Sequence, residues 1–244
     1  MKVAILLTGF AKNCDKTYPN LKKFLLDRYD CDIYISSWDK VQMSRPWSWD
    51  ANRPHSSAEK FPLYRLDTDS IKLMYEEHLV DSCFTSYDNY YHNRFANIKL
   101  LDRYRDTFKV NTDAKDRGSF WVERLRDQWY IVKKGWGLIQ NPEQYDVILR
   151  LRFDIDLKDI ELHKSNFTIP HNFLNINYCD YFAYGNARYM KKYCHLFDNI
   201  KSMYVDYNVD ISHADYMLKY YMENTGDKIK ATLDDSIKYE LIRN

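Results

Sequence analysis

The sequence predicts an α/β fold in which a single domain is built around a mostly parallel central sheet. A buried strand over Lys2–Thr8, an amphipathic helix over Thr17–Arg28 and a second strand over Asp32–Ser36 follow one another with short links. Strand, helix and strand in this order commonly open a parallel sheet that carries helices on both faces. A third apolar strand is expected over Val147–Leu149. With 244 residues, the chain is long enough to bury the core of one large domain.

The segment between the second and third strands is less regular. Trp38–Asp69 contains three prolines and three tryptophans without a clear period, so we expect a long loop that borders a cleft and closes over a bound ligand. Its Trp47 and Trp49 are candidates for stacking against a sugar ring. The elements expected next are a helix, a strand and a turn, over Ser70–Leu79, Cys83–Ser86 and Asp88–Asn93.

The strongest helical period in the chain lies in Phe120–Ile139, where large apolar residues recur every three or four positions. These residues are Trp121, Leu125, Trp129, Val132 and Trp136. We expect them to pack into the core, whereas Gln128, at the border of the stripe, is placed to reach a site. Beyond the third strand, two short strands and two helices are expected over Phe173–Ile176, Tyr181–Tyr184, Ala187–Phe197 and His213–Met222.

Composition and charge narrow the function classes. The 36 basic and 35 acidic residues leave a net charge of +1, which argues against a nonspecific nucleic-acid binder. The five cysteines are widely spaced and form no zinc motif, so we expect reduced thiols in a cytoplasmic protein. No apolar stretch approaches the roughly 20 residues of a membrane helix. Standard P-loop, dinucleotide-binding and Gly-x-Ser-x-Gly motifs are absent from the sequence.

The most informative stretch follows the apolar strand Val147–Leu149. Here Arg150, Arg152, Asp154 and Asp156 alternate with apolar residues. Side chains two positions apart in an extended chain point the same way, so we expect these charges on one face. The two aspartates can present oxygens to Mn²⁺ or Mg²⁺, and the arginines either contact phosphate oxygens or hold the aspartates in position. The alternative is an internal network of Arg–Asp ion pairs without a metal.

Several segments, in this order along the chain, resemble the sugar-nucleotide glycosyltransferases of bacterial surface-polysaccharide loci and large DNA viruses. Leu6–Lys12 resembles their first strand and turn, and Asp32–Asp39 resembles their second strand with its polar-Trp-Asp end. Gln128–Lys134 is similar to the central helix, and Tyr145–Asp156 is similar to an Arg-x-Arg-x-Asp strand. The later matches are Asp180–Gly185, a strand with an acid before an aromatic residue and a glycine, and His213–Asp215, a helix start.

This resemblance implies a GT-A-like fold in one domain, with a Rossmann-like nucleotide-binding half over about residues 1–156 and an acceptor half over about residues 157–244. It also implies an activity: transfer of a sugar from a nucleotide-diphosphate sugar to a glycan or glycoprotein acceptor in polysaccharide biosynthesis. The cofactor would be Mn²⁺ or Mg²⁺, held by Asp154 and Asp156 so that the departing diphosphate is neutralised. Both retaining and inverting enzymes use this fold.

Candidate residues for binding the nucleotide sugar lie mainly where strands end. They are Thr8, Gly9, Lys12, Ser37, Asp39, Gln128, Arg150 and Arg152. Lys12 is expected to supply the positive charge of the first turn, because Phe10 and Ala11 stand where relatives often carry a polar residue and an arginine.

An inverting enzyme needs a carboxylate that takes the proton of the acceptor hydroxyl, and Asp180 and Asp215 are the candidates. Asp180 is preferred, since an acid in the first turn of a helix is often only a favourable partner of the helix dipole. Two other functions would use the same residues. A metal-dependent phosphoesterase or nucleotidyltransferase would direct the carboxylates at phosphorus instead of carbon, and a carbohydrate- or nucleotide-binding module would bind without turnover.

Overall fold

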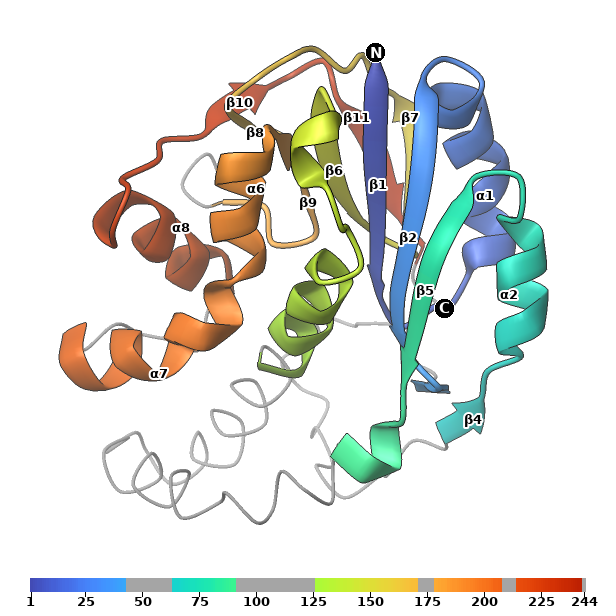
Figure 1. The fold of residues 1–244 in the computed structure, drawn as a ribbon, viewed down its shortest axis with the longest axis horizontal. Coiled ribbons are helices and arrows are strands. Elements are labelled where there is room, and N and C mark those ends of the chain that lie inside the picture. The colour runs from blue at the N-terminus through green and yellow to red at the C-terminus, as the bar shows by residue number, and fades with distance from the viewer. Residues whose placement is uncertain (43–62, 91–125, 171–177, 208–213, 243–244) are drawn as a thin grey trace, which may run out of the picture.

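The computed structural model describes residues 1–42, 63–90, 126–170, 178–207 and 214–242 (Figure 1). A seven-stranded sheet forms the centre of this part of the chain. In spatial order its strands are β10 (Thr232–Asp234), β8 (Phe167–Pro170), β9 (Phe182–Gly185), β6 (Val147–Arg152), β1 (Lys2–Gly9), β2 (Asp30–Trp38) and β5 (Leu79–Thr85). The predicted α/β fold with a mostly parallel central sheet is therefore confirmed.

One half of the sheet, formed by β6, β1, β2 and β5, is entirely parallel. The three apolar runs form neighbouring strands, with β1 between β2 and β6. Thr8, near the end of β1, stands in register with Ser36 and Arg152. All of Val3–Leu7 is buried, which explains why this strand reads as a continuous apolar run. Since parallel strands end at the same edge of a sheet, residues that follow β1, β2 and β6 are brought together there.

The other half of the sheet is mixed. β9 runs antiparallel to both β6 and β8, whereas β10 is parallel to β8. Two small antiparallel sheets accompany the central one among the described residues. They pair β7 (Ile155–Asp159) with β11 (Lys238–Leu241), and β3 (Lys40–Gln42) with β4 (Leu63–Arg65).

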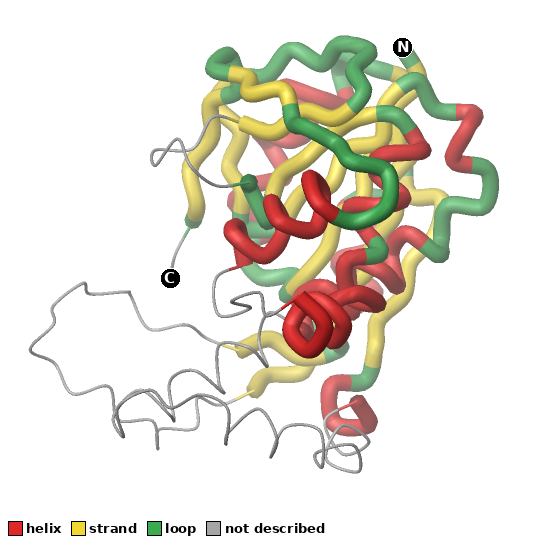
Figure 2. The backbone as a smooth tube through the Cα atoms, turned by 90° about the vertical axis from the view of Figure 1, so that its left-hand side faces the viewer, coloured by secondary structure: helices red, strands yellow, loops and turns green. Residues whose placement is uncertain are grey.

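Helices lie on both sides of the sheet (Figure 1). One side carries α1 (Cys14–Leu21), which continues as a π-helical turn over Lys22–Leu26, and α2 (Thr68–Met74). The other side carries a helix over residues 126–136 and α6 (Ala187–Cys194). Next to α6 are α7 (Leu196–Tyr207) and α8 (Ala214–Asn224), which lie in front of the sheet in the turned view (Figure 2).

Helix 126–136 packs closely on β1 and β2. Ser36 Oγ donates a hydrogen bond to Ile131 O at 2.8 Å, so the hydroxyl of a central strand is satisfied by the backbone of the helix. Trp129, Val132 and Trp136 are buried, which confirms their predicted place in the core. The same helix therefore has its apolar face in the core, and Gln128 lies at the edge of that face.

Most predicted elements occur with shifted ends. The first helix begins at Cys14, three residues earlier than expected, because Asn13 takes a left-handed conformation (φ 60°) that turns the chain after β1. α2 begins at Thr68, where the side chain of Asp67 caps the helix by accepting a hydrogen bond from Ser70 N at 3.1 Å. β5 starts at Leu79, and the helix expected over Ala187–Phe197 is interrupted at His195.

Several predictions lie outside the described residues. They concern the strand Phe173–Ile176, the central part of the Trp38–Asp69 loop with Trp47 and Trp49, and the closure of that loop over a ligand. No described helix is both long enough and apolar enough to cross a membrane.

The five cysteines are all free thiols. Cys14, Cys31, Cys179 and Cys194 are buried, and burial raises the pKa of each of these thiols; for Cys31, Cys179 and Cys194 it rises to about 12. Buried thiols that stay protonated are poor nucleophiles, whereas Cys83 is only partly buried.

We therefore expect an alkylating reagent at pH 7.5 to modify Cys83 alone in the folded protein, with all five thiols modified after unfolding in guanidinium. Mass spectrometry of the intact protein and of its peptides measures both states. Native modification of Cys179 or Cys194 at a rate similar to that of Cys83 would contradict the burial of these side chains.

The contact between β8 and β9 depends on Gly185. A Cβ at this position would lie 2.2 Å from Asn166 O and 3.0 Å from Phe167 Cα, so the two strands would have to separate. We expect Gly185→Ala to lower the free energy of unfolding by about 2–3 kcal/mol, as overpacking of a core does. Urea unfolding measures the change. The matched control is Gly137→Ala in the turn after helix 126–136, whose Cβ would meet only backbone oxygens of that helix, at 3.3 Å or more, and which should change stability far less.

Candidate functional site

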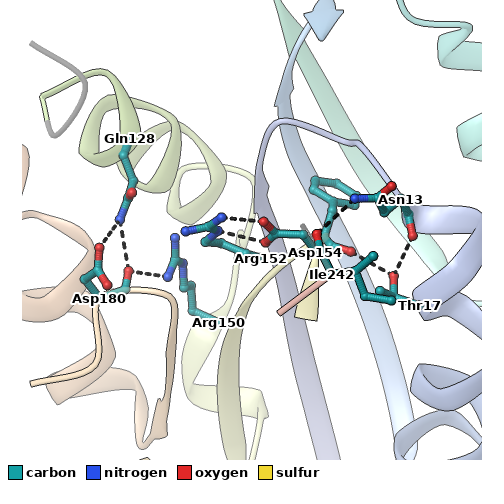
Figure 3. Close-up of polar contacts among 9 residues, drawn as sticks. Asn13, Thr17, Gln128, Arg150, Arg152, Asp154, Asp180 and Ile242 are labelled. Carbon is teal, nitrogen blue, oxygen red and sulfur yellow. Dashed lines mark hydrogen bonds and ion pairs between the residues drawn. The ribbon is translucent and has the colours of Figure 1, made fainter. Parts of the chain in front are cut away.

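Polar side chains gather where β1, β2 and β6 end. Thr8, Ser37 and Arg150 are buried polar residues of these strands. Asp154 is buried in the turn that follows β6, and Figure 3 shows it with Arg150 and Arg152. Each is brought to the same edge by the parallel register of the strands. Thr8 and Asp154 therefore lie at the same end of the sheet.

Arg150 is a fully buried arginine in the middle of this group. Its Nε donates a hydrogen bond to Thr8 Oγ1 at 2.9 Å, and its Nη1 donates to the main-chain oxygen of Asp180. Its Nη2 has no partner among the described residues. The sequence left two roles open for this arginine, contact with phosphate oxygens or the positioning of Asp154 and Asp156. Its complete burial and its contacts favour a supporting role, but toward Thr8 and Asp180 instead of those two aspartates.

The surroundings of Arg150 provide no thiolate or phenolate to balance its charge at neutral pH. Burial raises the pKa of Tyr193, Cys179 and Cys194, although the positive charge of Arg150 acts in the opposite direction on each. These groups therefore remain neutral beside the guanidinium. The balancing interactions are the oxygens of Thr8 and Asp180.

Asp180 lies two residues before β9 and is half-buried. Gln128, from helix 126–136, donates from Nε2 both to Asp180 Oδ2 and to Asp180 O, each at 3.0 Å (Figure 3). The carboxylate of Asp180 is thus held by a neutral amide and its main chain by Gln128 and Arg150 together. The structure brings together three residues that were predicted from separate segments.

Arg152 and Asp154 form an ion pair with two hydrogen bonds. Arg152 Nε donates to Asp154 Oδ1 at 2.9 Å, and Arg152 Nη2 donates to Asp154 Oδ2. The Asp154 side chain is 5% exposed, whereas the Arg152 side chain is 31% exposed. Arg152 is therefore the cation of this group that is partly open to solvent, and it lies over the ring of Tyr181 with its Cζ 5.9 Å from the ring centre.

The turn that carries Asp154 is held from two sides. Thr17 Oγ1 of α1 donates to Phe153 O at 2.8 Å, and Ile242 N, just beyond β11, donates to Asp154 O at 2.9 Å. Asn13 Nδ2 in turn donates to Ile242 O at 3.1 Å (Figure 3). Sequence reasoning missed these supports. The only local signal was Asn13, since asparagine tolerates the left-handed conformation that it takes here.

Asp156 lies in a different environment from Asp154. The expectation of one alternating face from Arg150 to Asp156 is wrong, because the chain turns at residues 153–154 and β7 leaves the central sheet. Phe153 and Ile155 are both buried in the core, so apolar and charged residues keep alternating through the turn. The alternation therefore predicts a continuous strand where the chain in fact turns. Asp156 accepts hydrogen bonds from Asn20 Nδ2 of α1 and from Lys158 Nζ, both at 2.6 Å.

A divalent cation held jointly by Asp154 and Asp156 does not fit these contacts. Arg152 engages both oxygens of Asp154, while Asn20 and Lys158 engage the two oxygens of Asp156. Among the residues that the structure describes, no group of three or more histidine, cysteine, aspartate or glutamate side chains is arranged to hold a metal. The internal ion-pair alternative describes the observed contacts of Asp154 better.

Four more predicted residues, Gly9, Lys12, Ser37 and Asp39, lie at or near the same edge, whereas Asp215 does not. Gly9 has a positive φ of 111°, which suits the turn after β1, and Lys12 N donates to Phe10 O in this turn. Ser37 Oγ accepts a hydrogen bond from Ala11 N at 3.3 Å, and Asp39 Oδ1 accepts one from Tyr87 N at 2.8 Å. Ser37 and Asp39 thus organise the backbone of the edge.

Asp215 lies in the first turn of α8, where its Oδ1 accepts a hydrogen bond from Tyr216 N at 3.1 Å. α8 packs against α6 and α7. The structure therefore joins Asp180, and not Asp215, to the contacts of Arg150 and Gln128.

An aromatic cluster beside these residues was not predicted. Trp38, at the end of β2, contacts Tyr87, Tyr90 and Tyr130, with ring centres 5.3, 4.9 and 6.0 Å away. Tyr130 also packs edge-on against Phe197 at 5.4 Å. The cluster joins the ends of β2 and β5 to helix 126–136 and α7, and so fixes the helix that carries Gln128.

Comparison with models of known protein families finds no match for this chain, and neither does a search of curated proteins.

The unequal partners of the two aspartates give a stability prediction. We expect Asp154→Asn to lower the free energy of unfolding by about 1–3 kcal/mol, because it leaves Arg152 without its charged partner in a mostly buried place. Asp156→Asn should cost less, since Lys158 is 44% exposed and also contacts Glu240 at 3.3 Å. Urea unfolding of both variants measures the difference.

The same unfolding experiments, repeated with Mn²⁺, test the cation. If both aspartates bound the metal together, Mn²⁺ would raise the urea midpoint of unfolding of the wild-type protein. The midpoint of either variant would then not respond to Mn²⁺. That outcome would contradict the assignment of the two side chains to separate contacts.

Proposed function

We propose that this protein is a glycosyltransferase that moves a sugar from a nucleoside-diphosphate sugar to a glycan or glycoprotein acceptor. The observation that carries the proposal is the grouping of Arg152, Asp154 and Asp180 at the carboxyl edge of the parallel half of the sheet, where β6 meets the antiparallel strand β9. Ligands of open α/β sheets bind at this edge. A partly exposed guanidinium there suits a diphosphate, and a carboxylate nearby suits a hydroxyl acceptor.

The arrangement of the sheet supports the finer assignment of a GT-A-like fold. A parallel half, β6-β1-β2-β5, shares one sheet with a mixed half, β10-β8-β9. This is the division into a nucleotide half and an acceptor half that the resemblance in sequence implies. Arg152 ends the last strand of the parallel half, and Asp180 precedes the first strand of the mixed half. Donor and acceptor would meet between these two residues.

The proposed reaction is a displacement at the anomeric carbon of the donor. The bond between this carbon and the diphosphate oxygen breaks, and a bond to the acceptor oxygen forms. The acceptor proton passes to the Asp180 carboxylate, and the electron pair of the broken bond leaves with the diphosphate. Arg152 would stabilise the negative charge that develops on the leaving group. Asp154 holds the Arg152 guanidinium in position for this role.

The resemblance also implies Mn²⁺ or Mg²⁺, and metal dependence stays a separate hypothesis. The contacts of Asp154 and Asp156 do not fit a joint metal site. We therefore assign the stabilisation of the negative charge on the leaving group to Arg152. Lys12, in the turn after β1, is a second candidate cation for the diphosphate. Turnover with Mn²⁺ and with a chelator tests whether a metal is required.

A donor screen tests the proposed function. The purified chain is incubated with UDP-, GDP- and TDP-sugars, with and without a mixture of glycan acceptors, and released nucleotide is measured. We expect release from one nucleotide class, and we expect it to depend on acceptor. Equal release without acceptor would instead indicate a phosphoesterase or nucleotidyltransferase. Donor binding without any release would indicate a binding module.

The role of Arg152 gives a kinetic prediction. Arg152→Gln removes the charge that faces the leaving group, so we expect kcat to fall by about 10²–10³-fold, as loss of one transition-state donor does. The matched control is Arg188→Gln on α6, because Arg188 pairs with Asp227 on the surface, where the two side chains are 68% and 64% exposed. An Arg152→Gln protein with unchanged kcat would contradict the assigned role.

A further inference from the structure

We infer that Gln128 and Arg150 are positioning residues for Asp180, which they hold by its carboxylate and its main chain. The inference rests on the proposed function, in which Asp180 takes the acceptor proton. Neither residue is assigned contact with substrate. Each acts on the reaction only through the place and orientation of the Asp180 side chain.

The first support is the way in which the Asp180 carboxylate is bound. Gln128 Nε2 donates to Oδ2 at 3.0 Å, while Oδ1 has no hydrogen-bond partner among the described residues. One oxygen is therefore oriented by the protein, and the other is left to receive a proton. The donor is a neutral amide, and no arginine or lysine among the described residues forms an ion pair with this carboxylate. A cation bound directly to it would oppose its work as a base.

The second support is the main chain of Asp180. Its carbonyl oxygen accepts one hydrogen bond from Gln128 Nε2 and one from Arg150 Nη1, so two side chains from different elements hold a single carbonyl. A carbonyl oxygen has two lone pairs, and both are used here. Asp180 lies outside β9, and backbone pairing with β6 reaches only its neighbour Tyr181, whose O accepts a hydrogen bond from Arg152 N at 3.2 Å. The side chains of Gln128 and Arg150 hold the main chain of Asp180 itself.

The third support is the cost of placing Arg150 in the interior. A carbonyl at this edge could be satisfied by water or by a neutral side chain. The protein instead buries a guanidinium completely, with Nη2 unsatisfied among the described residues and no described carboxylate within ion-pair distance. Such a group is expensive to bury and calls for an explanation. Positioning of a reacting carboxylate supplies one.

Arg150 also connects the two halves of the sheet. Its Nε bonds to Thr8 at the end of β1, and its Nη1 bonds to Asp180 ahead of β9. Because the guanidinium is rigid and planar, these two bonds set the distance between the end of the parallel half and the acid. Asp180, the proposed base for the acceptor hydroxyl, is thereby held at a fixed distance from the strands that would bind the donor.

The test compares Gln128→Ala, Gln128→Asn and Gln128→Glu with the matched control Gln140→Ala, an exposed glutamine just after the same helix. With the donor found in the screen, we expect Gln128→Ala to lower kcat by about 10–100-fold while the donor KM stays within about twofold. Gln128→Asn, one methylene shorter, should recover part of the loss. Gln128→Glu should be worst, because its carboxylate faces that of Asp180. The control should match the wild-type protein.

The outcomes separate this inference from the function on which it rests. If the wild-type protein transfers no sugar from any donor, the proposed function and the inference both fail. If it transfers sugar and Gln128→Ala keeps its kcat, or changes kcat and KM equally, the inference alone fails. Thermal unfolding of each variant checks that the fold survives. Arg150→Lys is a second variant, and wild-type kcat in a folded Arg150→Lys protein would also overturn the inference.

Discussion

The buried guanidinium of Arg150 is the constraint around which the end of the sheet is organised. An arginine does not lose its proton inside a protein, so every element near it has to supply an acceptor or remain neutral. β1 supplies the hydroxyl of Thr8, and the segment before β9 supplies the carbonyl of Asp180. Helix 126–136 then completes the arrangement through Gln128. A single charge thus determines which parts of three elements face one another.

The second organising feature is the separation of the charged residues that follow β6. The turn at residues 153–154 places Asp154 against Arg152 and sends Asp156 toward α1. Each carboxylate is buried, and each has a cation within hydrogen-bond distance. Of the two arginines at the end of β6, Arg152 is the one that is partly exposed. The edge of the sheet therefore presents a held cation where the sequence alone suggested a pair of metal ligands.

The elements that could be predicted from the sequence are those whose patterns are local. Val3–Leu7 and Val147–Leu149 are continuous apolar runs, and burial on both faces makes such runs central strands. The turn before β7 escaped prediction because Phe153 and Ile155 are both buried, so the alternation of a strand continues through it. The pairing of β7 with β11 joins residues about eighty positions apart, and no local pattern reports such a contact.

The sequence predicted which residues belong to the candidate site better than it predicted which of them contact one another. Arg150, Arg152 and Asp154 stood out because charges directly after a buried strand need partners. Which partners they have depends on long-range packing: Asp180 and Gln128 reach Arg150 and each other from separate elements. Thr17 and Ile242, which hold the Asp154 turn through their hydroxyl and backbone, carry no sequence signal of that role.

The hydrogen bond between Asn13 and Ile242 has a consequence for the order in which the protein folds. It joins residues 229 positions apart, and Ile242 also holds the turn of Asp154. Closing so long a loop has an entropic cost that is recovered only when the intervening chain is already folded. The polar edge is therefore expected to be completed late in folding, after the strands of the central sheet have paired. A partly folded chain with an intact sheet would still have an unsupported Asp154 turn.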